Sequence, residues 1–314
     1  SYRGGFYSSL ILTSSISFLR ILLQCLNLCP HKLLSMSNIL FIADFFADQV
    51  PGGGELSNNA LINRLFKLGY NVRSVNSHLV NHMDLLYNEN IIVSNFANLS
   101  EENKKDLQNR NYIIYEHDHK YLPGRNPGIY PEYHAPKEDI INRQFYANAK
   151  AVLCQSQFHA NIARKNLELD NIVSLGGNLW SDDHFSILEE ICRNPQRQNR
   201  HAVIMSNTKH KNTARAIDYC RTLGLEHDVI PPLEPSTFLR ELGARSTLVF
   251  FPETPETLSR VVVEARMMGM GTKTTNNIGA IHEEWFSKKG LDLIDYMRYK
   301  QEEIVKNTLS YLDN

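Results

Sequence analysis

Short apolar runs alternate with amphipathic segments along the chain from Met36 onward. Apolar runs of about four to eight residues between polar turns are typical of buried strands, and longer segments with helical periodicity are typical of amphipathic helices. In the first half of the chain we therefore predict strands at 38–45, 71–75, 91–96, 112–115, 151–155 and 171–175. Helices are predicted at 55–68, 138–148 and 157–167. This alternation predicts an α/β fold with a parallel, doubly wound sheet.

The second half of the chain repeats the alternation. Strands are predicted at 201–205, 227–230 and 247–251, with helices at 212–223, 235–242 and 296–312. The polar stretch 182–200 contains the run Asn-Pro-Gln-Arg-Gln-Asn and is interpreted as an interdomain linker. We therefore predict two Rossmann-like domains, at 36–181 and 200–295, followed by a C-terminal helix within 296–314.

The composition is that of a globular protein. A length of 314 residues allows about two domains, and 42% hydrophobic and 21% charged residues are enough to form cores. The formal net charge of −1 provides no overall basic field, so we expect no nucleic-acid partner. The cysteines show no metal-like pairing, and we expect those in the domains to be reduced thiols. They are Cys25, Cys29, Cys154, Cys192 and Cys220.

The first 35 residues differ from the rest of the chain. They contain Arg3, Arg20 and Lys32 but no Asp or Glu, and serines and Arg20 interrupt the apolar stretch 10–28. This segment could be a signal anchor or a membrane-surface helix. Alternatively, it is upstream sequence outside the natural protein. Because Met36 stands just before the first predicted strand, we expect translation to start there and the leader 1–35 to be non-native.

The segment 251–269, FPETPETLSRVVVEARMMG, places two carboxylates around a strand-to-helix junction. A buried strand is predicted up to Pro252 and a helix from about Thr257. Glu256 would then lie in the loop at the carboxyl end of the strand, where open α/β sheets bind ligands. Glu264 follows after seven intervening residues, on the helix. A solvated amphipathic helix with two surface glutamates would show the same spacing.

This pattern resembles the signature of retaining nucleotide-sugar glycosyltransferases of the GT-B architecture, especially family four. Their signature is a Glu, a short turn, a hydrophobic run and then Glu-Ala, which corresponds here to Glu256 and to Glu264-Ala265. Leu258-Ser259 replaces the Phe-Gly that is usual in the family. The resemblance covers residues 36 to about 295 and implies two Rossmann-like domains facing a cleft. In this family the last helix often crosses back to the first domain, as 296–314 could here.

A glycine-rich loop, Gly52-Gly53-Gly54-Glu55, separates the first predicted strand from the first predicted helix. Glycines permit close backbone approach, and a helix N-terminus attracts anions. The loop has neither the spaced glycines of a dinucleotide fingerprint nor the Gly-Lys-Ser/Thr of a P-loop. The resemblance implies that Gly53 and Gly54 approach the donor phosphates and the acceptor. The alternative is an ordinary flexible turn.

The loop 206–212, SNTKHKN, follows the first strand of the second predicted domain. In the family an Arg and a Lys five residues apart bind the donor diphosphate at this place. Lys211 matches the Lys, but Ser206 stands where the Arg is expected, so one positive charge is missing. Lys209 could supply it from another position. The alternative is a solvated basic loop.

The loop 116–120, EHDHK, follows the fourth predicted strand. His117 and His119 would point to opposite sides of an extended segment and no further ligands are evident, so we predict no metal site. In the family a His at this strand end faces the donor sugar, and His117 matches it best. A polar surface loop is the alternative. The long Pro-rich segment 122–136, with Arg125, Tyr130 and Tyr133, is predicted to recognise the acceptor.

The resemblance implies transfer of a sugar from a nucleotide-diphosphate donor to a hydroxyl acceptor, with retention and an oxocarbenium-like transition state. Glu256 would hold hydroxyls of the sugar, and His117 would orient the sugar or assist proton movement. Glu264 would accept hydrogen bonds from the ribose hydroxyls. The lysines and the amides of Thr257, Leu258 and Ser259 would stabilise the leaving diphosphate.

The expected partners are a nucleotide-sugar donor, which is a substrate, and a glycan or lipid-linked glycan acceptor of cell-envelope or polysaccharide synthesis. No cofactor or metal is implied. We expect a cytoplasmic protein with a potential peripheral contact at the inner face of a membrane. Two alternatives remain: a degenerate protein that only binds nucleotide sugar, which the missing Arg and Phe-Gly favour, and a nucleotide-sugar epimerase. A dehydrogenase is disfavoured because the glycine fingerprint is absent.

Overall fold

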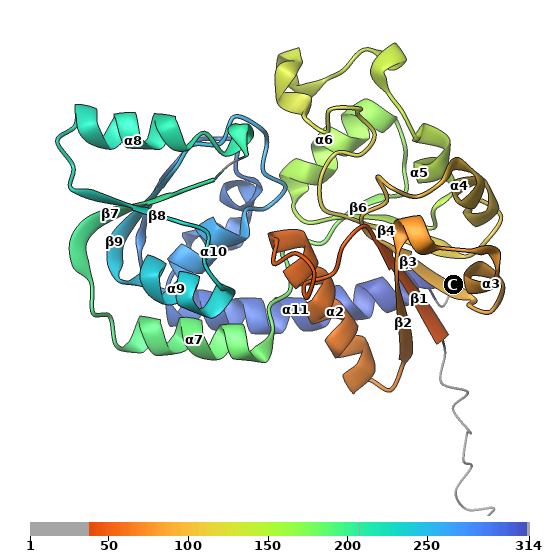
Figure 1. Ribbon diagram of the computed structural model, residues 1–314, viewed down its shortest axis with the longest axis horizontal. Helices are drawn as coiled ribbons and strands as arrows, with labels where there is room; N and C mark the ends of the chain where they lie inside the picture. The colour runs from red at the N-terminus through yellow and green to blue at the C-terminus, as the bar shows by residue number, and fades with distance from the viewer. Residues whose placement is uncertain (1–37, 207, 313–314) are drawn as a thin grey trace, which may run out of the picture. The chain divides into compact units, whose positions relative to one another are not determined.

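The computed structural model describes residues 38–206 and 208–312, so the predicted leader at 1–35 lies outside the described residues. The described chain contains two parallel sheets, of six and four strands, each flanked by helices (Figure 1). This confirms the predicted fold class of two Rossmann-like α/β domains. No helix in 38–206 or 208–312 is both long enough and apolar enough to cross a membrane.

The first sheet has the strand order β2-β1-β3-β4-β5-β6, and all its pairs are parallel. Its strands are β1 Asn38–Ala43, β2 Asn71–Asn76, β3 Asn90–Val93, β4 Tyr112–Glu116, β5 Val152–Cys154 and β6 Ile172–Ser174. The strand order reverses between β1 and β3. At such a switch point the loops leave toward opposite faces of the sheet and open a crevice at the carboxyl ends of the strands.

Both faces of the first sheet are buried, which is why its strands read as continuous apolar runs rather than as alternating patterns. Leu40 and Ile42 of β1 pack into one core, whereas Ile39 and Phe41 pack into the core on the other face. The covering helices are α2 Gly53–Lys67, α3 His82–Leu86, α4 Glu101–Leu107, α5 Arg143–Asn148 and α6 Gln157–Leu167. The helix predicted at 138–148 is shorter than expected, because Asn142 has a left-handed backbone (φ 57°) just before α5.

The second sheet has the parallel strand order β10-β9-β7-β8, with its switch point between β7 and β9. Its strands are β7 Gln198–Ile204, β8 His227–Ile230, β9 Arg245–Phe250 and β10 Gly271–Thr274. The helices α8 Thr213–Thr222, α9 Pro235–Gly243 and α10 Arg260–Met267 connect them. Val203 and Val249 pack with α8 on one face of the sheet, while Leu248 and Phe250 face α9 and α10 on the other.

The prediction of an interdomain linker at 182–200 is wrong, because most of this segment forms a helix. Helix α7 covers Asp182–Arg193, and Ser181 caps it by accepting a hydrogen bond from the backbone N–H of His184. Phe185 and Leu188, three residues apart, are fully buried in the core of the second domain. The charged residues on the opposite face of α7 concealed this stripe, and only 194–197 separate the helix from β7.

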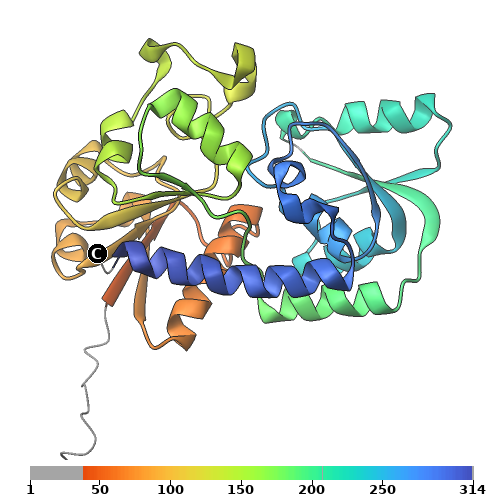
Figure 2. The ribbon, with the colours of Figure 1, turned by 180° about the vertical axis from the view of Figure 1, so that it is seen from behind.

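Helix α11, Leu291–Leu312, packs against both domains (Figure 2). Its first turns place Leu293 and Met297 in the core of the second domain. Its last turns place Ile304 and Leu312 in the core beneath the first sheet. Polar contacts reinforce this end, where Arg64 lies 2.6 Å from Glu302 and the Asn111 amide donates to the carbonyl of Leu312 at 2.8 Å.

Candidate functional site

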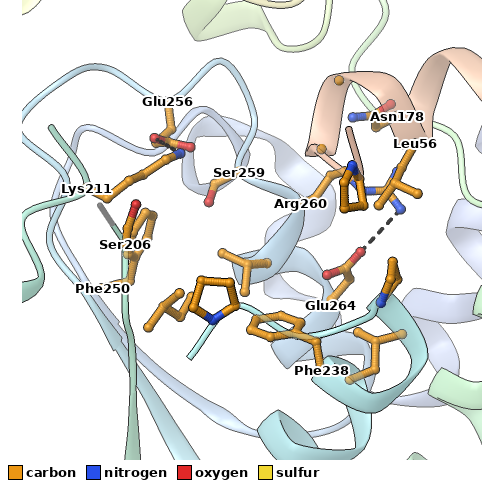
Figure 3. Close-up of a pocket in the computed structure, with 18 of the residues that line it drawn as sticks. Leu56, Asn178, Ser206, Lys211, Phe238, Phe250, Glu256, Ser259, Arg260 and Glu264 are labelled. Atoms are coloured by element: carbon orange, nitrogen blue, oxygen red, sulfur yellow. Dashed lines mark hydrogen bonds and ion pairs between the residues drawn. The ribbon is translucent and has the colours of Figure 1, made fainter. Parts of the chain in front are cut away.

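A pocket of about 480 Å³ lies at the carboxyl ends of the strands of both sheets (Figure 3). Its lining segments follow β1, β4, β5 and β6 of the first sheet and β7, β8 and β9 of the second. The loops after β7 and β9 flank the switch point of the second sheet, where α/β folds bind ligands. The volume falls within the range of about 300 to 1,000 Å³ that is usual for ligand sites.

Most of the predicted site residues line this pocket. They are Gly53, Gly54, His117, Ser206, Lys211, Glu256, Thr257, Ser259 and Glu264. Leu258 does not line it, because its side chain is fully buried in the core of the second domain and anchors the loop there. The side chain of Lys209 lies outside what the structure describes. The fold therefore brings together loops that are far apart in the sequence.

Lys211 and Glu256 form an ion pair on one side of the pocket (Figure 3). Lys211 Nζ lies 2.7 Å from Glu256 Oε1, and the Glu256 side chain is only 16% exposed. The backbone of Glu256 is fixed on both sides, because its N–H donates to Asn277 and its carbonyl accepts from Gly279. The carboxylate is therefore held on a rigid loop, whereas the lysine reaches it from the loop after β7.

A second ion pair, between Arg260 and Glu264, lies on the opposite side of the pocket in Figure 3. The guanidinium approaches Glu264 Oε1 to 3.3 Å, and both side chains are 8% exposed. The same carboxylate oxygen accepts a hydrogen bond of 2.8 Å from Trp180 Nε1. The Arg260 guanidinium lies 4.7 Å from the centre of the Trp180 ring. Burial lowers the pKa of Arg260, and the Glu264 carboxylate opposes this effect.

Helix α10 starts three residues later than the sequence predicted, because Ser259 has a left-handed backbone (φ 72°, ψ 85°). Such a conformation is uncommon for a residue with a side chain and is often found at functional sites. The Ser259 hydroxyl is buried, and no hydrogen-bond partner is found for it among the described residues. Ser259 lines the pocket, so this buried hydroxyl belongs to its wall.

His117 extends from the end of β4 into the pocket as a neutral ring. Burial lowers its pKa to about 3, with a further contribution from the nearby Lys120 ammonium. Gln155 Nε2 donates to Nδ1 of the His117 ring. The other ring nitrogen, His117 Nε2, lies 2.7 Å from Asn58 Oδ1 and can donate to it. Both ring nitrogens are thus bonded within the protein, so His117 is better suited to orienting a ligand than to exchanging protons with it.

The glycine-rich loop brings the start of α2 against these side chains. A Cβ on Gly53 would lie 3.3 Å from Cδ of Arg260, and one on Gly54 would lie 3.3 Å from Cγ of His117. Larger residues would push both side chains out of place. Gly52 is the N-cap and offers no side-chain cap, whereas the Glu55 carboxylate lies at this first turn and accepts a hydrogen bond from its own backbone N–H. The other amide groups of the first turn remain for an anion.

The loop 116–120 is a buried ion cluster rather than a polar surface loop. The carboxylate of Glu116 pairs with Lys120 and accepts from the backbone N–H groups of His117 (3.2 Å) and Asp118 (3.0 Å). Burial raises the pKa of Glu116 to about 7, whereas the Lys120 ammonium holds that of Asp118 at about 2. This cluster fixes the backbone that carries His117. Residues 38–206 and 208–312 contain no group of three His, Cys, Asp or Glu suited to a metal ion.

Several lining residues escaped the sequence analysis. Arg260 directly precedes the apolar run and was given no role, and Gln155 and Asn178 carry no recognisable motif. An apolar end of the pocket is formed after β8 by Pro231, Pro232, Leu233 and Phe238. The adjacent prolines directly after a predicted strand were the available signal, because a strand's carboxyl end followed by a rigid loop is a common ligand-binding position.

No known protein-family model and no curated protein matches the chain. Solved structures do resemble it. A glycosyltransferase from Rickettsia africae is 14% identical, with a TM-score of 0.51 over 88% of this chain and 94% of that one. HepE from Anabaena, in complex with UDP and glucose, is 14% identical, with a TM-score of 0.48 over 88% and 92%. An alpha-glucosyltransferase bound to UDP and DNA is 10% identical, with a TM-score of 0.48 over 88% and 92%.

The likeness to the Rickettsia protein concerns the fold, since the identity is so low. Together with the two parallel sheets, it shows that the chain has the GT-B fold of glycosyltransferases.

Proposed function

We propose that the chain is a retaining glycosyltransferase that moves a sugar from a nucleotide-diphosphate donor to a hydroxyl of a glycan. One observation carries this proposal. A single pocket holds two cation–carboxylate pairs, Lys211 with Glu256 and Arg260 with Glu264, beside the start of α2 and the start of α10. Cations and helix N-termini suit phosphates, and carboxylates suit sugar hydroxyls.

The donor would lie along the pocket with its nucleoside against the second domain. The apolar end, formed by Pro232, Leu233 and Phe238, offers a surface for a base. Glu264 would accept hydrogen bonds from the ribose hydroxyls through the oxygen that Trp180 does not occupy. The diphosphate would then lie near Lys211, Ser259 and the glycine-rich loop.

The sugar would lie at the Glu256 end of the pocket. Glu256 would hold its hydroxyls, and the neutral ring of His117 would orient it without exchanging a proton near neutral pH, because the pKa of His117 is about 3. As the bond from the anomeric carbon to the diphosphate breaks, negative charge develops on the leaving group. Lys211 and the amides following Glu256 would stabilise that charge in place.

We further propose a glycan or lipid-linked glycan acceptor of cell-envelope or polysaccharide synthesis, handled in the cytoplasm or at the inner face of a membrane. The segment 122–136 would recognise it. This segment is tied to the Glu256 loop, because Tyr133 donates to Asn277 at 2.6 Å, and Asn277 accepts from Glu256 through its backbone. The net charge of −1 favours a glycan over a nucleic acid.

The experiment is a panel of nucleotide sugars, with release of the nucleoside diphosphate as the readout. Each donor is tested alone, with cell-envelope glycan extracts, with lipid-linked glycans and with DNA or RNA, and with a chelator as a further arm. The anomeric configuration of the product, determined by NMR, tests retention. An inverted product would contradict the retaining mechanism, and transfer to nucleic acid would contradict the proposed acceptor class.

A nucleotide-sugar-binding protein without turnover is the second candidate. Position 206 holds a serine and not the cationic residue of the family pattern. Both ring nitrogens of His117 are hydrogen-bonded within the protein, so this side chain is not free to assist turnover. Tight donor binding with no release across the full acceptor panel would favour this candidate. Conversion of the donor sugar without any acceptor would instead indicate an epimerase.

A further inference from the structure

We infer that Arg260 is the second cation of the diphosphate site and replaces the positive charge that position 206 lacks. This inference rests on the proposed function and names a binding residue for it. The starting point is that a diphosphate carries more charge than one lysine balances. Among the described residues that line the pocket, Lys211 and Arg260 are the lysine and arginine side chains. His117 is neutral, and burial lowers the pKa of His184.

Ser206 carries no charge and cannot supply the missing cation. Its hydroxyl accepts a hydrogen bond of 3.1 Å from the backbone N–H of Thr208, and its own N–H donates to Thr213 at 3.2 Å. The side chain therefore stabilises its own loop. The pocket needs a second cation from another element if it binds a diphosphate.

Arg260 is placed to provide that cation. Its side chain lies against the glycine-rich loop, because a Cβ on Gly53 would be 3.3 Å from its Cδ. It thus adjoins the start of α2, and the preceding residue in the chain, Ser259, lines the same pocket and has a buried hydroxyl without a partner among the described residues. A guanidinium and a hydroxyl without a partner thus converge beside a helix N-terminus, and the guanidinium is the positive charge among them. The Glu55 carboxylate also lies at this helix start, so a bound anion depends on Arg260 rather than on the helix alone.

The guanidinium is held firmly but retains free donors. It donates to the carbonyl of Leu179 at 2.5 Å and lies over the ring of Trp180. Its contact with Glu264 is a longer ion pair of 3.3 Å. A guanidinium has five N–H donors, so these contacts leave some of them for a ligand. Trp180 and Leu179 would keep its orientation while the ligand binds.

Binding of a nucleoside diphosphate would give both Arg260 and Glu264 new partners, so neither of these two buried charges would be left unpaired. Glu264 would turn from Arg260 to the ribose hydroxyls while still accepting from Trp180 Nε1. Arg260 would then direct its charge to the diphosphate, as Lys211 would after leaving Glu256. Because an unpaired buried charge is costly, each exchange is favourable only when the ligand offers both hydroxyls and phosphates. The site would therefore select a nucleoside diphosphate over either part alone.

The test compares UDP, UMP and uridine by calorimetry, with ADP and GDP as alternatives if UDP does not bind. Arg260→Met should weaken binding of the diphosphate on the order of 10- to 100-fold, because a charge-assisted contact is lost. Uridine binding should change by less than about threefold. Arg260→Lys should retain part of the diphosphate affinity. Arg221→Met, at an exposed position on α8, is the matched control and should leave all three affinities unchanged.

A rescue experiment separates ligand binding from folding. Ser206→Arg in the Arg260→Met background should restore the preference for diphosphate, since it returns a cation to the pocket. Thermal melts of each variant show whether it is folded, and Arg260→Lys serves if Arg260→Met is not. If Arg260→Met weakened uridine and UDP binding equally, so that the ratio of their affinities did not change, the inference would be overturned while the proposed function stayed intact. A folded wild-type protein that binds no nucleoside diphosphate would overturn the proposed function itself.

Discussion

Lys211 Nζ lies 2.7 Å from Glu256 Oε1, which joins the loop after β7 to the loop after β9. These loops flank the switch point of the second sheet, so the ion pair stands where a ligand is expected. A donor would have to separate the two groups and give each a new partner. The strength of this pair therefore opposes donor binding, and removing one partner should affect binding and turnover differently.

Glu256→Ala should lower turnover by on the order of a hundredfold, because a well-oriented polar group that acts in the transition state is lost. Binding of the nucleoside diphosphate should stay the same or tighten, since Lys211 is released from its partner. Steady-state transfer assays and calorimetry measure the two effects. Glu253→Ala changes an exposed carboxylate in the same loop and should leave both unaffected. Equal turnover in the Glu256 variant and the wild type would refute the assigned role.

Glu264→Gln should weaken nucleotide binding by on the order of 10- to 100-fold, because charge-assisted bonds to the ribose hydroxyls are lost. The fold should persist, since a glutamine oxygen can still accept from Trp180 Nε1. Calorimetry with the nucleoside diphosphate and a thermal melt measure these effects. Unchanged affinity for a ligand that the wild type binds would remove Glu264 from the site.

Gly279→Ala should displace the Glu256 loop and lower both stability and turnover. A Cβ at this position would collide with the carbonyl of Thr257 and would lie 2.5 Å from Ser156 Oγ. Crowding of this kind costs about 1–3 kcal/mol. Gly124→Ala is the matched control, because no heavy atom lies within 4 Å of the added Cβ. Urea unfolding should separate the two variants, and equal stabilities would contradict the crowding argument.

Stability should fall as the pH is lowered from about 6.5 toward 4. Burial lowers the pKa of His117 to about 3, that of His119 to about 4 and that of His159 still further. In this window the unfolded chain binds protons that the folded state excludes. Each histidine therefore lowers the free energy of unfolding by up to about 1.4 kcal/mol for every pH unit that the pH falls. Glu116 has the opposite effect, because its pKa is raised to about 7 and its contribution to stability is lost as the pH rises. It therefore offsets the contribution of one of the three histidines.

Urea unfolding across this pH range measures the effect, and His159→Gln should reduce the slope by about one proton. A stability that does not change between pH 5 and pH 6.5 would show that these histidines are not held neutral in the folded state.

The strands were predictable because both sheets are parallel and buried on both faces. Apolar runs such as those predicted at 38–45 and 112–115 therefore stood out against their polar flanks, and the observed β1 and β4 agree with them to within two residues. Strand β10 was missed, because its sequence Gly-Thr-Lys-Thr lies at the sheet edge and pairs with β9 alone. Helix α7 was missed because its polar face dominates its composition, although Phe185 and Leu188 mark its buried side.

The site was predictable where a loop follows a strand, and less so where a side chain reaches in from a helix. Glu256 and Lys211 could be placed from the ends of predicted strands. Arg260 could not, since its burial depends on Trp180 and on the glycine-rich loop, which are distant in sequence. The ion pair between Lys211 and Glu256 was also beyond sequence reasoning, because residues from two different loops form it.

Helix α11 has a consequence for how the chain folds as it is synthesised. The core beneath the first sheet includes Ile304, Val305 and Leu312. Helix α2 covers part of that face, but the first domain cannot complete its burial until residues 304–312 have left the ribosome, although its strands end at Ser174. Until then, Ile39, Phe41 and Ile113 would lack part of their cover and would be a natural binding site for a chaperone.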